Sequence, residues 1–224
     1  MIDAYKKNKE KKINTEFIIN EKFDFVHEDK SPKGVSSYVT IQEGCDKFCA
    51  FCVVPFTRGP EYSRSIKSIV DESKSLIDRG SKEIVLLGQN VNAYNYKDEK
   101  NIVYNLSKLI DEVSKLDNIK RIRYTTSHPN NMDLELIKLH GSNEKLMPFL
   151  HLPVQSGSNE ILKKMNRKYN VDEYKKIIDQ LKFYKPNIEI SSDFIVGFPG
   201  ETNNDFESTL DLVEYVKFKQ SYSF

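Results

Sequence analysis

The sequence predicts an α/β fold built on a parallel sheet, and three observations predict it. From Ser37 onward, short apolar runs alternate with amphipathic stretches. We count five strand–helix alternations, a pattern typical of parallel α/β sheets. Small polar residues also gather just after the expected strands. With 224 residues, of which 38% are hydrophobic, the chain can form one sizeable core and is expected to hold one or two domains.

Each element is expected from its own pattern. Apolar runs that end at glycine or polar residues predict strands at 38–42, 83–87, 121–126, 149–154 and 188–196, with a sixth beginning at 220–224. Apolar residues at helical spacing predict helices at 66–77, 106–113, 134–139, 174–181 and 206–216. Gly80 is expected to end the first of these helices.

Two architectures fit this element order: an open doubly wound sheet, and a barrel or partial barrel. A full eightfold barrel needs about 250 residues, whereas about 190 remain after the expected linker, enough for about six units. In both architectures ligands bind at the carboxyl ends of the strands. Five expected strand ends carry polar residues, namely the cysteine loop, 88–90, 125–128, 155–157 and 193–197.

Composition and charge restrict the class of protein. There are 34 basic and 33 acidic side chains and a net charge of +1, so no overall basic field points to nucleic acid, and a local patch stays open. No stretch approaches the roughly 18 apolar residues of a membrane span, and the start of the chain lacks the apolar run of a secretory signal. Charge runs and turn residues predict that 1–35 is a linker preceding a core domain at 36–224.

All three cysteines lie within eight residues, as Cys45, Cys49 and Cys52 in a Cys-x3-Cys-x2-Cys loop. Such clustering fits a reducing cytoplasm. Three thiolates without a fourth suit a 4Fe-4S cluster with one iron open to a further ligand. Structural zinc prefers four ligands, and Asp46 and His128 remain candidates for the fourth. The third interpretation is three ordinary buried cysteines.

A set of motifs lies along the chain around these cysteines, at 45–52, 52–64, 87–94, 126–129, 151–158, 165–167 and 193–202. Together they resemble the radical S-adenosylmethionine (SAM) methylthiotransferases. The resemblance spans most of the chain, from Phe23 to Phe224, in the family's motif order. Within the family, 53–59 and 88–94 resemble the branch that methylthiolates isopentenylated adenosine next to the anticodon of tRNA. The branches acting on a ribosomal protein or on threonylcarbamoyl-adenosine are the alternatives.

The resemblance implies a partial (β/α)6 radical SAM barrel that ends in the sixth strand. It implies that Cys45, Cys49 and Cys52 hold the 4Fe-4S cluster, whose open iron chelates SAM and leads to a 5′-deoxyadenosyl radical. No catalytic acid or base is assigned, and an ordinary loop histidine is the simpler interpretation of His128. The implied SAM contacts are Phe51, Gly88, Gln89, Asn90, Gln155, Ser156 and Asp193.

The family also implies partners: tRNA, and an electron donor such as flavodoxin or ferredoxin, for a monomeric cytoplasmic enzyme. By this resemblance, family members have three domains: an amino-terminal domain with a second 4Fe-4S cluster, the radical SAM domain and a carboxyl-terminal RNA-binding domain. Neither flanking domain is expected in this sequence. We therefore expect a fragment that does not complete methylthiolation by itself. The competing hypothesis from another class is a non-catalytic metal-binding fragment.

Overall fold

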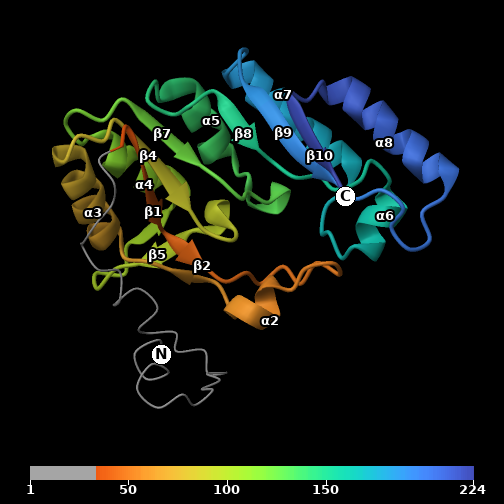
Figure 1. The fold of residues 1–224 in the computed structure, drawn as a ribbon, viewed down its shortest axis with the longest axis horizontal. Helices are drawn as coiled ribbons and strands as arrows, with labels where there is room; N and C mark the ends of the chain where they lie inside the picture. The colour runs from red at the N-terminus through yellow and green to blue at the C-terminus, as the bar shows by residue number, and fades with distance from the viewer. Residues whose placement is uncertain (1–33) are drawn as a thin grey trace.

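The structure is a computed structural model that describes residues 34–224 (Figure 1). Its described part contains two three-stranded parallel sheets. The first sheet has the order β1 (Ser36–Thr40), β4 (Glu83–Leu87) and β7 (Arg121–Tyr124). The second has the order β8 (Phe149–His151), β9 (Glu189–Phe194) and β10 (Gln220–Ser223). The predicted α/β class is confirmed.

Backbone hydrogen bonds join the two sheets. The Ile122 amide donates to the Lys145 carbonyl over 2.7 Å, and the Met147 amide donates to the Ile122 carbonyl over 3.0 Å. A parallel bridge pairs Ile122 with Leu146. The six strands are therefore neighbours in chain order, β1-β4-β7-β8-β9-β10. Because a doubly wound sheet reverses its order at a switch point, this uninterrupted order decides for a partial barrel.

Five longer helices cover the sheet, and α3, α5, α7 and α8 follow its outer edge in Figure 1. Each begins at a polar residue whose side chain accepts a backbone N–H, an arrangement that stabilises a helix by about 1 kcal/mol. The caps are Ser65, Asn105, Asp133, Asn170 and Thr202. The helices are α3 (Ile66–Asp78), α4 (Leu106–Ser114), α5 (Leu134–Ser142), α7 (Val171–Tyr184) and α8 (Asn203–Val216).

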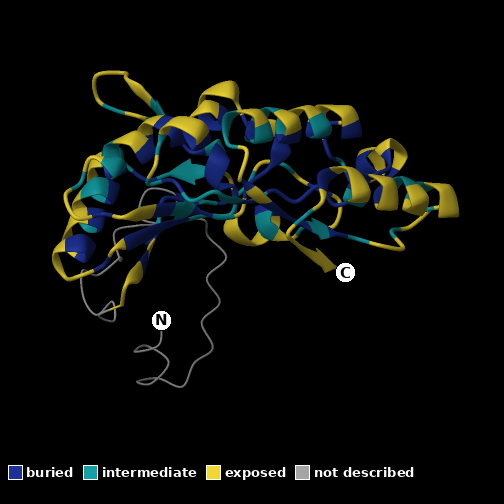
Figure 2. Ribbon diagram, turned by 90° about the horizontal axis from the view of Figure 1, so that it is seen from above, coloured by how far each residue is buried: buried dark blue, intermediate teal, exposed yellow. Residues whose placement is uncertain are grey.

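The core lies between the sheet and this helical layer, as the buried residues of Figure 2 show. Val39, Ile84 and Ile122, from three neighbouring strands, are fully buried. The helices pack in sequence, α3 on α4, α4 on α5 and α5 on α7. Strand β10 differs, because all four of its residues are exposed at the edge of the sheet.

Several strands end earlier than the sequence predicts. The expected strand 38–42 is divided, because β1 ends at Thr40 and β2 (Gln42–Glu43) pairs antiparallel with β3 (Tyr62–Ser63). Strands β7, β8 and β9 end two or three residues short of 126, 154 and 196. Thr126 and Gln155 have φ angles of 64° and 77°, so the backbone leaves the extended conformation just beyond β7 and β8.

Short elements escaped prediction because two to six residues carry little periodicity. They are α2 (Val54–Arg58), α6 (Asn159–Lys164), β5 (Asn95–Lys97), β6 (Val103–Asn105) and the 3-10 turns Val91–Ala93 and Pro129–Asn131. Across residues 34–224, no helix is long and apolar enough to cross a membrane. The linker predicted at 1–35 lies outside the described residues, apart from its last two.

Candidate functional site

The cysteine loop runs from the end of β2 into α2. Cys49 is 9% exposed, while Cys45 and Cys52 are half-buried. The Cys52 amide donates to the Cys49 carbonyl over 2.9 Å. Gly44 opens the loop with a φ of 80°, and a Cβ there would overlap the carbonyl groups of Gly59 and Pro60. The loop therefore needs glycine at its entry.

The Cys45 thiol lies in a partly buried setting near acidic groups. Burial raises the pKa of the Cys45 thiol to about 11. A backbone hydrogen bond from Lys47 opposes this rise, and negative charge on Glu61, Cys49 and Cys52 adds to it. Within residues 34–224, no three His, Cys, Asp or Glu side chains are arranged to hold a metal ion. Cluster binding would therefore require the three sulfur donors of this loop to turn towards one another and to bind as thiolates.

Gln42 ties this loop to the end of β4. Its side-chain amide donates to the Gly44 carbonyl over 2.6 Å, and its Oε1 accepts the Gln89 and Asn90 amides at 3.0 Å each. In return, the Gly44 amide donates to Gln89 Oε1 over 2.7 Å. A Cβ on Gly88 would lie 2.7 Å from Gln42 oxygens. The structure therefore brings together two clusters that the sequence predicted separately.

Three buried polar atoms at the ends of β4 and β7 have no hydrogen-bond partner: Asn90 Oδ1, Ser127 Oγ and His128 Nε2. The two strand ends are adjacent, since the Val91 amide donates to the Thr126 carbonyl over 3.0 Å. Leaving such an atom unpaired costs about 1–3 kcal/mol. These atoms offer donors and acceptors to a polar ligand at the edge where the cysteine loop lies, so this edge fits a bound cofactor.

His128 is held rigidly in this edge. Its backbone exchanges two 2.8 Å hydrogen bonds with the Asn92 side chain, and its Nδ1 accepts the Asn130 amide over 3.3 Å. Burial lowers the pKa of His128 to about 2, and the charges of Arg167 and Lys47 add to the effect. The ring is therefore neutral, and its proton is assigned to Nε2. His128 can donate a hydrogen bond, and it is poorly suited to general acid–base work.

The predicted residues after β8 and near the end of β9 form a second group. The Gln155 amide donates to the Asp193 carbonyl over 3.0 Å, so these two residues lie side by side. The Asp193 carboxylate lies 3.4 Å from His151 Nε2. Ser156 is fully buried, accepts the Ser158 amide over 3.1 Å and lies 3.4 Å from the Thr209 hydroxyl. Ser156 is thus engaged in packing against α8, together with Gly157, whose amide donates to the Thr209 hydroxyl over 2.9 Å.

Exposed apolar side chains border the cysteine loop. Phe51, which the sequence analysis singled out, is 41% exposed, and Phe48, Val53 and Phe56 are more exposed still. The Phe48 and Phe56 rings meet edge to face at 6.0 Å between centroids. Phe51 therefore stands at the rim of the site and outside the core.

The segment after α6 also reaches this loop, which the sequence analysis did not predict. The Ala50 amide donates to the Met165 carbonyl over 3.0 Å, and the Asn166 side chain donates to the Phe48 carbonyl over 2.7 Å. Arg167 Nη1 lies 3.5 Å from Cys49 Sγ. The available signal was the Met-Asn-Arg motif, which pattern reading could not connect to a loop 118 residues away.

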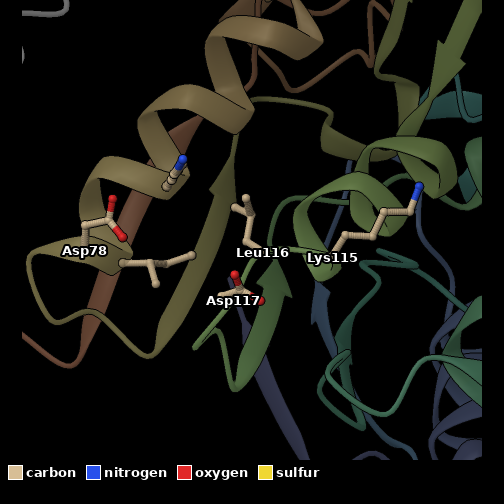
Figure 3. A pocket seen from close by; sticks show the side chains of 6 residues that line it. Asp78, Lys115, Leu116 and Asp117 are labelled. Carbon is tan, nitrogen blue, oxygen red and sulfur yellow. The ribbon is translucent and has the colours of Figure 1, made fainter.

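A separate surface pocket lies between the carboxyl-terminal ends of α3 and α4 (Figure 3). Each helix runs back along its strand, so this pocket lies near the amino ends of the strands, away from the cysteine loop. Lys115 there pairs with Glu112 over 2.5 Å. We assign the pocket no role. Its lining is Lys74, Ile77, Asp78, Lys115, Leu116 and Asp117.

Comparison with known proteins agrees with this geometry. The chain is 58% identical over 221 residues to tRNA-2-methylthio-N(6)-dimethylallyladenosine synthase of Anaplasma phagocytophilum, which covers 97% of this chain and 49% of that protein. It is 53% identical over its full length to the protein of the same name from Rickettsia prowazekii, covering 50% of that protein. The chain thus spans about half the length of the curated relatives it matches.

Solved structures share the fold at low identity. The radical SAM methyltransferase TsrM from Kitasatospora setae, solved with tryptophan and a SAM analogue, superimposes with a TM-score of 0.66 at 17% identity. That match covers 85% of this chain and 36% of TsrM. The radical SAM enzyme coproporphyrinogen III oxidase (HemN) from Escherichia coli gives 0.53 at 18% identity, covering 84% of this chain and 44% of HemN.

The family description "Radical SAM superfamily" matches residues 39–213, a span that begins in β1, contains the cysteine loop and ends in α8. Enzymes of this superfamily use a 4Fe-4S cluster and SAM. The strand order and the three-cysteine loop are consistent with this family match. Because the match covers most of the chain, the chain belongs to the radical SAM superfamily.

Proposed function

We propose that this chain is the cofactor-binding core of a radical SAM methylthiotransferase that acts on isopentenylated adenosine in tRNA. The observation that carries the proposal is the pairing of a three-thiol loop with three unpartnered buried polar atoms at the same edge of the sheet. Thiolates are the ligands that iron–sulfur clusters require, and free donors and acceptors are what SAM requires. The curated relatives supply the substrate class by their names.

In this proposal Cys45, Cys49 and Cys52 ligate the cluster. When bound, the cluster supplies one electron for the reductive cleavage of SAM. Glycine at 88 lets the chain pass close to Gln42, which keeps the end of β4 against the cysteine loop. The predicted SAM contacts remain part of the proposal, with Ser156 ranked last because its hydroxyl is already engaged. They are Phe51, Gly88, Gln89, Asn90, Gln155, Ser156 and Asp193.

A mononuclear zinc site is less well supported. Asp46 was one candidate for a fourth ligand, but its carboxylate accepts the Glu61 amide over 3.2 Å. His128 was the other, and its Nδ1 accepts a backbone amide. With Nδ1 accepting that amide, the ring proton lies on Nε2, so neither nitrogen of His128 offers zinc a lone pair.

The remaining parts of the proposal concern context. We propose tRNA as the macromolecular substrate, flavodoxin or ferredoxin as the electron donor, and a monomer working in the cytoplasm. We also propose 36–224 as the core domain, preceded by a linker at 1–35. A second 4Fe-4S cluster belongs to the full-length family member in this proposal.

The cluster is tested by anaerobic reconstitution of this chain with iron and sulfide, followed by metal and sulfide analysis. We expect four irons and four sulfides per chain for a 4Fe-4S cluster. Stoichiometric zinc, with no iron retained, would support the metal-binding alternative. With SAM and dithionite, the loaded chain should then form 5′-deoxyadenosine, measured by chromatography, whereas the Cys49→Ala variant should form none.

The substrate is tested in a chimera, in which this chain replaces the matching half of the Anaplasma phagocytophilum relative. We expect a methylthio product on isopentenylated tRNA, detected by nucleoside mass spectrometry. The same chimera carrying Cys49→Ala is the control. Product on threonylcarbamoyl-adenosine or on a ribosomal protein instead would assign the chain to another branch.

A further inference from the structure

Arg167 is a buried arginine without an acidic partner. It is 8% exposed, and no carboxylate in residues 34–224 forms an ion pair with it. An unpaired charge in the interior is costly, so buried arginines are usually matched by an anion. The group that its guanidinium reaches is Cys49 Sγ, at 3.5 Å from Nη1.

The guanidinium is fixed in this direction. Arg167 Nη2 donates to the Pro153 carbonyl over 2.7 Å, and Nε donates to the Tyr169 hydroxyl over 2.9 Å. That hydroxyl in turn donates to the Val154 carbonyl over 2.8 Å. Pro153, after β8, thus holds one of the three nitrogens, and Tyr169, after α6, holds the second. The third faces the Cys49 sulfur. Because guanidinium is a rigid planar fork, these bonds orient Nη1 as well.

The neighbouring residues hold the rest of the cysteine loop. Asn166 has a φ of 58° and donates to the carbonyl of Phe48, whose own φ is 49°. Met165 accepts the Ala50 amide. The Met165–Asn166–Arg167 turn is therefore hydrogen-bonded to both residues that flank Cys49. It also places the positive guanidinium of Arg167 next to the Cys49 sulfur. The sequence singled out this motif, and the proposed function leaves it without a role.

We propose that Arg167 is a positioning residue that stabilises the Cys49 thiolate and raises the reduction potential of the cluster. This inference rests on the proposed function, because it requires the cluster. Reduction adds one electron from an external reductant, with no bond made or broken and no proton taken up. The reduced cluster is more negative by one charge, so a buried cation stabilises it more than the oxidised form. Hydrogen bonds to a ligating sulfur act in the same direction.

The test is a redox titration of reconstituted chains, poised with dithionite and mediator dyes and monitored by the EPR signal of the reduced cluster. Arg167→Gln removes the charge and Arg167→Lys keeps it. Arg121→Gln, at the amino end of β7, is the matched control for loss of one remote positive charge. At a fixed potential we expect Arg167→Gln to lower the reduced-to-oxidised ratio about tenfold, or 59 mV for one electron. Arg167→Lys and Arg121→Gln should stay within about twofold of the parent chain, since both keep the charge at the sulfur.

Two results would overturn the inference: a ratio for Arg167→Gln within twofold of the parent, or a tenfold loss in Arg167→Lys. The second result decides the matter even if Arg167→Gln fails to fold. These failures are distinct from failure of the proposed function, in which the parent chain itself would retain no iron or sulfide, and which would end both proposals.

Asn166→Gly separates positioning from charge. Glycine accepts the positive φ of this position without strain, so only the hydrogen bond to Phe48 is lost. We expect the cluster to be lost to an iron chelator several times faster than from the parent, while its potential stays unchanged. A shifted potential in Asn166→Gly would show that loop geometry, and not the Arg167 charge, sets it.

Discussion

The two halves of the sheet present polar residues at the same edge but use them differently. At the ends of β4 and β7, three buried polar atoms lack partners, on Asn90, Ser127 and His128. After β8, by contrast, the Ser156 hydroxyl is engaged with Ser158 and Thr209. Because buried polar groups are normally satisfied, the unpaired atoms of the first half support our proposal of a ligand there, whereas the Ser156 hydroxyl of the second half is already paired.

The comparison separates two kinds of polar residue that look alike in a sequence. Ser158 also illustrates the closed kind, since its hydroxyl donates to Asp205 Oδ1 over 2.5 Å and caps α6. Those bonds connect α6 to α8 and stabilise the fold. Removing a residue of the first kind should therefore weaken ligand binding, while removing one of the second should weaken the fold.

The largest effect is expected at the cysteine loop. Cys49→Ala removes one of three thiolates, and we expect iron and sulfide after reconstitution to fall to background, because no spare cysteine exists in the sequence. The apo form should unfold at nearly the parent temperature, as seen by circular dichroism. Ala50→Ser, in the next position, is the control and should retain the cluster. A loaded Cys49→Ala chain would refute the assignment.

The next largest effect tests the open half. Asn90→Ala removes a buried acceptor that no protein group in residues 34–224 uses, together with the Nδ2 hydrogen bond to Glu61. SAM affinity should fall by roughly 5- to 150-fold, from a loss of about 1–3 kcal/mol. Isothermal calorimetry on the loaded chain measures this. Asn95→Ala, at an exposed position in β5, is the control and should bind SAM like the parent. Equal affinity in both variants would break the comparison between the two halves.

The third effect tests the closed half. Ser156→Ala should destabilise the fold by about 1 kcal/mol, because the Ser158 amide loses its acceptor. For a chain of this size the melting temperature should fall by about 2–4 °C. SAM affinity should stay within about twofold of the parent if that hydroxyl only supports the fold. A large loss of SAM affinity with unchanged stability would instead make Ser156 a direct SAM contact, as the sequence predicts.

The last effect appears only at acidic pH and lies in the helical layer. His140 of α5 is 1% exposed, lies 2.6 Å from the Tyr124 hydroxyl through Nε2, and leaves Nδ1 without a partner. Burial lowers the pKa of His140 from 6.5 to about 4, with the charge of Lys185 adding to the effect. Below pH 6.5 the unfolded chain therefore takes up a proton that the folded chain refuses, and stability falls as the pH drops from 6.5 towards 4.

His140→Gln removes this titration. In urea unfolding between pH 6.5 and 4, we expect its stability to depend less steeply on pH than that of the parent, by up to about 1.4 kcal/mol per pH unit. Lys138→Gln, on the exposed side of the same helix, should leave the slope unchanged. An equal slope in His140→Gln and the parent would show that folding does not lower the pKa of His140.

The sequence predicted the type and order of the main elements because hydrophobic periodicity is a local property. The helix predicted at Ile66–Ile77 ends one residue before α3 does, and both ends of β4 were predicted correctly. The prediction extended β8 and β9 too far, since their apolar residues continue after the ladder ends, and it extended β7 over Thr125 and Thr126, whose branched side chains favour strands. Gln42 was read as the end of a strand, and its role in joining the cysteine loop to β4 became visible only in its hydrogen bonds.

The sequence by itself determined the α/β alternation, the three thiolate donors and the strand ends that carry polar residues. Those properties depend on residue type and on the spacing of residues close together in the chain, and both can be read directly from the sequence. Only the tertiary structure decided between the two architectures, because strand order is a matter of which distant segments pair. It alone also showed that Arg167 faces Cys49. It further showed that Asn90 Oδ1 has no hydrogen-bond partner in the described residues, while the Ser156 hydroxyl has one, since hydrogen bonding depends on how the chain packs.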